Sequence, residues 1–236
     1  PMRDYISDET LNALGRRNIC WTETTKGRIK YVAPDDDITY KIIGMLLLEN
    51  YGIGFTKDNI RKLWIENLPI YTCWGPERNM LLKSGIASLT PDMPIDYDEW
   101  SDVLNPGEEL CGALIRADAY GYSCPGRPDI ASKLAWQDAS WSHKKTGVYG
   151  SMFIAAAIAA AQVIDDRMGI FELALKYIPQ RSRFHEIVED SIKEVKTAKD
   201  WEDGYDRIHG KYQEYGACRV YQETGTLINT VKFAKD

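Results

Sequence analysis

Residues 37–51, DITYKIIGMLLLENY, repeat apolar side chains at the spacing of an α-helix, with Tyr40, Ile43 and Leu47 on one face. Gly52 follows directly, and glycine is the residue that most easily adopts the left-handed conformation in which many helices end. The stretch therefore predicts a helix over residues 37–51 with one face buried in a core.

The same periodicity continues along most of the remaining chain. A second helix is expected to begin after Thr56 and to stop at Pro69. Further helical segments are expected at 76–83, 108–122, 129–141, 149–164, 169–177, 182–196, 201–212 and 224–234. Residues 85–107 contain several prolines and glycines and are expected to form a loop. Because no useful period-two pattern is present, the sequence predicts an all-α, compact multi-helix fold, taken as a single domain over residues 1–236.

The overall charge argues against a nucleic-acid partner. The chain carries 29 basic and 35 acidic residues, a net charge of −6, which repels a phosphate backbone. The most apolar segment, residues 149–164, is shorter than a bilayer span and is followed by Asp165, Asp166 and Arg167. It is interpreted as a buried core helix, and no membrane association is expected.

The cysteines are few and scattered. There are five, an odd number, and none forms a C-x-x-C pair: Cys20, Cys73, Cys111, Cys124 and Cys218. This pattern suggests neither a disulfide framework nor a structural zinc site, and it favours a reducing, cytoplasmic compartment.

The acidic triplet Asp35, Asp36 and Asp37 immediately precedes the first predicted helix. Three adjacent carboxylates repel one another unless solvent or a cation offsets their charge, and such hard oxygen donors suit Mg²⁺, Mn²⁺ or Ca²⁺. The alternative is that the carboxylates only stabilise the helix N-terminus, by about 0.3–1 kcal/mol each. A site for two ions about 3.5–4 Å apart would need further ligands from elsewhere in the chain.

Two later blocks combine polar groups with glycine. Residues 105–118 read NPGEELCGALIRAD, in which Gly112 is the expected point of close backbone approach. Arg116 and Asp118 are candidates either for substrate contact or for an internal ion pair. Residues 135–143 read AWQDASWSH and end at His143, which on its own favours a helix cap or a surface residue. His185 and His209 are interpreted as surface residues.

In this order, the three blocks resemble motifs of the ADP-ribosylglycohydrolases. The triplet resembles the family's acidic metal-binding motif, often Thr-Asp-Asp, with Asp35 in place of the threonine. Residues 105–118 resemble its Gly-Ala-x-x-Arg segment, with Cys111 in place of an asparagine. Residues 135–143 resemble its Thr-His segment, with Ser142 in the threonine position, and residues 221–230 resemble the helix before its last motif.

The resemblance implies a hydrolase that cleaves the N- or O-glycosidic bond of ADP-ribosylated proteins or small molecules with two Mg²⁺ ions, or Mn²⁺. Asp36 and Asp37 would be the catalytic metal ligands, and Asp35 would be a third ligand. The substrate-binding residues would be Glu109, Cys111, Gly112 and His143, with Arg116 and Asp118 as second choices.

Two motifs of that family are not found in the sequence: an early Gly-Asp-x-x-Gly segment and a late Gly-x-Asp-x-Asp segment that completes the metal site. The chain is therefore expected to be truncated at both ends. Two alternatives to an active hydrolase follow. One is a relative that binds ADP-ribose without turnover, and the other is a helical interaction scaffold whose acidic triplet is only a solvated cap.

Overall fold

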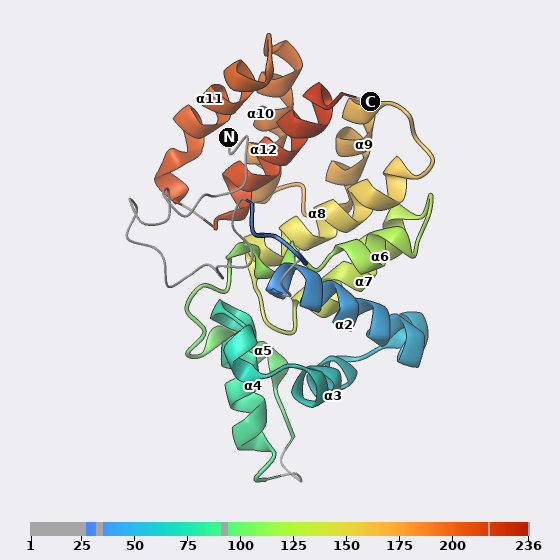
Figure 1. Ribbon diagram of the computed structural model, residues 1–236, viewed down its shortest axis with the longest axis vertical. Coiled ribbons are helices and arrows are strands. Elements are labelled where there is room, and N and C mark those ends of the chain that lie inside the picture. The colour runs from blue at the N-terminus through green and yellow to red at the C-terminus, as the bar shows by residue number, and fades with distance from the viewer. Residues whose placement is uncertain (1–26, 32–34, 91–93, 217, 236) are drawn as a thin grey trace. The chain divides into compact units, whose positions relative to one another are not determined.

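The computed structural model describes residues 27–31, 35–90, 94–216 and 218–235 (Figure 1). Its contacts divide the chain into two compact units, Pro1–Thr39 and Tyr40–Asp236. The expectation of a single domain over the whole chain stays a prediction. Cys20 and Pro34 lie outside the described residues.

Across the described ranges the chain forms eleven α-helices, joined by turns and short 3-10 segments, and no strand. They are α2 (Asp36–Tyr51), α3 (Lys57–Asn67), α4 (Gly75–Ala87), α5 (Tyr97–Asp102), α6 (Asp118–Tyr122), α7 (Pro128–Ala139), α8 (Lys145–Ala161), α9 (Arg167–Ala174), α10 (Arg183–Thr197), α11 (Trp201–Tyr212) and α12 (Val220–Phe233). The all-α prediction is confirmed. None of these helices combines the length and apolar character needed to cross a bilayer.

Local sequence signals set several helix ends. Thr56 begins α3 as predicted, because its side chain accepts from the backbone N–H of Asn59 while the Asn59 side chain accepts from the Thr56 N–H at 2.8 Å. This reciprocal pair satisfies two N–H groups that a helix N-terminus leaves without partners. Ser182 caps α10 in a similar way, accepting from the N–H of His185.

Helix α8 is the centre of the second unit's core, packed by α7, α6, α9 and α12 (Figure 1). Its alanines Ala155, Ala156 and Ala159 are fully buried, which confirms the interpretation of this segment as a core helix. The small side chains let neighbouring helices come close. At Gly121 in α6, a Cβ atom would lie 2.6 Å from the Cβ of Ile158.

Two predictions about the middle of the chain were wrong in part. Residues 85–107 contain helix α5, whose N-terminus is capped by Asp96. The predicted helix over 108–122 is α-helical only in α6. The reason is long-range pairing: the Glu108 carbonyl accepts from the N–H of Lys144, and the Cys111 N–H donates to the carbonyl of Cys218. These groups are thus not available for helical hydrogen bonds.

Candidate functional site

The acidic triplet forms the start of α2. Asp35 caps the helix, because its Oδ1 accepts from the N–H of Ile38 at 3.2 Å and its carbonyl accepts from the Thr39 hydroxyl at 2.5 Å. The side chains of Asp35 and Asp37 are exposed, and Asp36 is partly buried. One carboxylate oxygen from each of the three aspartates lies within 4.8 Å of the others.

This arrangement fits a divalent cation. Carboxylate oxygens are the donor type that Mg²⁺ or Mn²⁺ prefers, and one from each aspartate lies within 4.8 Å of the other two. The helix-cap interpretation also holds for Asp35, but its bond to Ile38 occupies only one of the two carboxylate oxygens. Capping and metal binding are therefore compatible, and the triplet would supply part of the ligand shell.

A buried ionic network lies within the second unit, centred on Arg116. The Arg116 side chain is 1% exposed. Its Nη1 donates to Glu77 Oε1 at 2.5 Å, its Nε donates to the Asp138 carboxylate, and its Nη2 donates to Ser142 Oγ at 2.8 Å. The guanidinium also lies over the ring of Trp64, 5.3 Å from its centroid. Arg116 thus joins α4, α7 and the segment that follows α7.

The network keeps Arg116 charged. Burial alone would lower the pKa of the guanidinium, but the adjacent carboxylates of Asp138 and Glu77 raise the pKa above its ordinary value. A buried charge is tolerated when it is paired and hydrogen-bonded in this way. The role of Arg116 in substrate contact stays a prediction. Such a contact would require its present hydrogen bonds to open.

His143 lies at the edge of this network and is fully buried, unlike a typical surface or cap residue. Burial and the charge of Arg116 lower its pKa well below the ordinary value, so the imidazole is neutral at pH 7. Its Nδ1 lies 2.8 Å from Ser142 Oγ. Because the Ser142 hydroxyl has no other hydrogen-bond acceptor among the described residues, we assign its proton to the bond with Nδ1, which places the imidazole proton on Nε2.

That Nε2 has no hydrogen-bond partner among the described residues. A buried donor without a partner costs about 1–3 kcal/mol, so the His143 N–H leaves a hydrogen bond unsatisfied in the core. Gly147 makes room for the ring, because a Cβ there would lie 2.9 Å from His143 Cδ2.

Gly112 is a point of close approach, as predicted, and its neighbour is a protein carboxylate. A Cβ at this position would lie 2.5 Å from Glu77 Oε1. Any side chain here would therefore displace the carboxylate that pairs with Arg116. Gly112, Arg116 and His143, which stand apart in the sequence, meet around Glu77.

The other predicted residues lie outside this network. The suggested internal pair of Arg116 with Asp118 is wrong, because Asp118 pairs with Lys41 Nζ at 2.8 Å. Glu109 is partly exposed and lies 3.6 Å from Lys145 Nζ. Among the described residues, Cys111 forms no hydrogen bond with Arg116 or His143. Its thiol lies beside Cys218 and Glu223.

His185 and His209, interpreted as surface residues, are each only partly exposed. The His209 ring stacks on Tyr205 with centroids 3.9 Å apart.

Sequence reasoning missed Glu77 and Asp138. Glu77 follows Pro76 at the start of α4, where an acidic residue is ordinary. Asp138 carried a usable signal, since it lies three and four residues after Ala135 and Leu134 and so shares their buried face of α7. A carboxylate on an apolar helix face requires a buried partner.

The comparisons with known proteins identify the family of the chain. A family model described as ADP-ribosylglycohydrolase matches residues 36–234, which include Asp36, Asp37 and the whole buried network. No curated protein and no solved structure matches the chain. Since the family model covers most of its length, the chain belongs to the ADP-ribosylglycohydrolase family.

Proposed function

We propose that this protein hydrolyses the N- or O-glycosidic bond that links ADP-ribose to a protein or small molecule, with the help of two Mg²⁺ ions, or Mn²⁺. Family membership supports the hydrolase class. The observation that carries the metal requirement is the convergence of Asp35, Asp36 and Asp37 within 4.8 Å.

Bound divalent ions would supply an activated water and stabilise negative charge that develops during bond cleavage. Asp36 and Asp37 would hold them, with Asp35 as a third ligand that also caps α2. On the substrate side, His143 would donate through Nε2 to an ADP-ribose oxygen, beside Glu109, Cys111 and Gly112. Arg116 is assigned as a positioning residue, because it holds Ser142, which in turn fixes the His143 tautomer. Asp118 is assigned no direct contact, because it pairs with Lys41.

The test uses the full chain with peptides ADP-ribosylated on arginine or serine, and measures ADP-ribose release with and without Mg²⁺. We expect release that requires Mg²⁺ and that is lost in Asp36→Asn and Asp37→Asn. Asp165→Asn, a change at an exposed acidic residue, is the matched control and should keep activity.

Two other results would replace the proposal. Calorimetric binding of ADP-ribose without release would identify a relative that binds but does not turn over. Neither binding nor release, with an unchanged melting temperature on addition of Mg²⁺ and ADP-ribose, would identify a helical scaffold, since specific ligands of the native state must stabilise it.

A further inference from the structure

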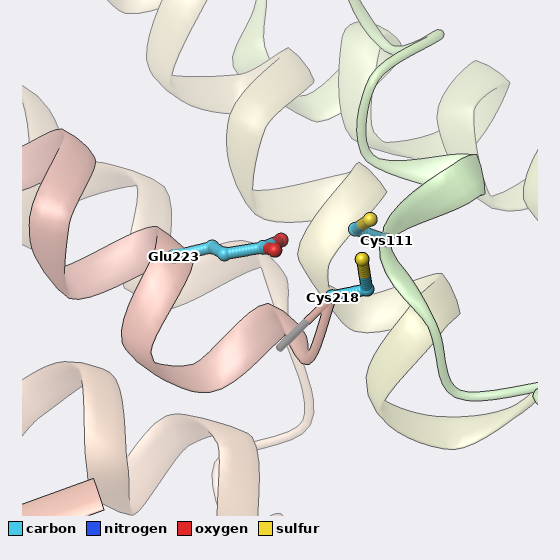
Figure 2. Close-up of side chains that lie close together, drawn as sticks. All are labelled: Cys111, Cys218 and Glu223. Carbon is cyan, nitrogen blue, oxygen red and sulfur yellow. The ribbon is translucent and has the colours of Figure 1, made fainter. Parts of the chain in front are cut away.

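Two thiols and a carboxylate from distant parts of the sequence meet in the second unit (Figure 2). Cys111 opens the 3-10 segment Cys111–Ala113, Cys218 lies two residues before the start of α12, and Glu223 lies in the first turn of α12. One ligand atom from each residue, two Sγ atoms and a carboxylate oxygen, lies within 4.8 Å of the other two. Figure 2 shows the Glu223 carboxylate directed toward the two sulfur atoms.

The backbone holds the two cysteines opposite each other. Leu110 and Arg219 form an isolated antiparallel bridge, and the Cys111 N–H donates to the Cys218 carbonyl at 3.2 Å. Cys218 has a φ of 60°, a left-handed conformation that is uncommon for a residue with a side chain. Strain of this kind persists only where surrounding structure imposes it. The thiols are thus brought together by main-chain pairing.

The charge around Glu223 is not balanced by a basic residue. Among the described residues, no Lys, Arg or His forms an ion pair with Glu223. Burial raises the pKa of Glu223, and burial together with Glu223 and Cys218 raises the pKa of the Cys111 thiol. Burial thus disfavours the anionic forms of Glu223 and of the Cys111 thiol, and a bound cation would stabilise them.

We propose that Cys111, Cys218 and Glu223 bind a thiophilic divalent cation of the Zn²⁺ class. Two thiolates and one carboxylate match the ligand types of protein zinc sites, whereas Mg²⁺ prefers oxygen alone. Three protein ligands leave a fourth position for water. Because Cys218 is exposed, the ion would enter from solvent.

The proposed ion would be coordinated by both segments and would thereby link the start of α12 to the segment that contains Gly112. The sequence did not suggest this site, because its cysteines lack the short spacing of common zinc motifs and meet only through folding. A disulfide between Cys111 and Cys218 is the competing outcome. The position of Glu223 favours the cation, since a disulfide needs no third donor.

The experiment titrates the reduced full chain with Co²⁺, a spectroscopic stand-in for Zn²⁺, and then displaces it with Zn²⁺. We expect the absorption of a thiolate–cobalt bond to saturate at one thiolate-bound ion per chain, followed by loss of that absorption as Zn²⁺ binds. Cys218→Ser, a change at an exposed position, should abolish the thiolate–cobalt band or weaken binding by at least about tenfold, and Glu223→Gln should weaken binding similarly.

Two controls assign the signal. Cys124→Ser, at a cysteine outside the cluster, and Asp36→Asn, in the acidic triplet, should both keep the thiolate–cobalt band of the original chain. Circular dichroism checks that each variant keeps its helical content. The absence of a thiolate–cobalt band in the reduced chain, or an unchanged band in Cys218→Ser, would overturn the proposal. Two results together would show a disulfide instead. Mass spectrometry would find the chain lighter by two hydrogens with Cys111 linked to Cys218, and the chain would give no thiolate–cobalt band after reduction.

Discussion

Arg116 is the residue on which the buried network depends. It donates to Glu77 and Asp138, which are as deeply buried as the arginine itself. Removing one partner of a buried ionic group costs far more than removing an exposed pair, because the remaining charge cannot return to water. The network therefore predicts a strong dependence of stability on this single side chain.

We expect Arg116→Met to lower the free energy of unfolding by about 3–5 kcal/mol, since it removes the guanidinium that pairs with two buried carboxylates. Arg127→Met is the matched control, because Arg127 pairs with Asp129 in solvent and such pairs contribute about 0–1 kcal/mol. Urea denaturation of both variants measures the difference. Equal losses in the two variants would contradict the role given to Arg116.

His143 predicts how stability depends on pH. Its native pKa is lowered, so below the unfolded value of about 6.5 the unfolded chain binds a proton that the native chain does not. His143 should therefore not affect the free energy of unfolding above about pH 6.5. As the pH is lowered from about 6.5, the free energy of unfolding should decrease by up to about 1.4 kcal/mol per pH unit. Denaturation at several pH values should show this change in the free energy of unfolding with pH. The change should be smaller in His143→Gln and unaltered in His185→Gln. An unchanged slope in His143→Gln would refute the assignment.

At the scale of elements, local signals predicted helices well where they acted alone. The Thr56 cap and the segment 201–212 agree with α3 and α11. The helix predicted over residues 108–122 was wrong in part, because backbone groups of this segment pair with Lys144 and Cys218. Sequence periodicity does not reveal such distant partners. For the same reason, the sequence identified Gly112, Arg116 and His143 as candidates but not Glu77, the residue around which they meet.

Gly112 gives a prediction at this scale. Gly112→Ala places a methyl group where Glu77 Oε1 lies, so we expect a loss of about 1–3 kcal/mol in stability from overpacking. Gly210→Ala, in the open on α11, should instead stabilise the protein by up to about 1 kcal/mol through better helix propensity. Thermal unfolding of the two variants should show shifts of opposite sign. A stabilised Gly112→Ala would mean that Glu77 does not occupy this position.

For the whole molecule, the alanine-rich α8 brings α6, α7, α9 and α12 around a single core in the second unit. This packing positions the Arg116 network and the Cys111–Cys218–Glu223 cluster. The fold class could be predicted from the sequence, because helical periodicity is local and recurs along the chain. The candidate site could be predicted only in part, because buried ion pairs and the convergence of ligands depend on which helices become neighbours.

The proposed function depends on divalent cations bound by the carboxylates at the start of α2. Electron paramagnetic resonance of Mn²⁺ measures this binding, because the free-ion signal disappears when the ion binds. The full chain should remove Mn²⁺ from solution and release it when Mg²⁺ is added, whereas the double variant Asp36→Asn, Asp37→Asn should leave the free-ion signal unchanged. Equal binding of Mn²⁺ by the double variant, or no binding by the original chain, would contradict the claim.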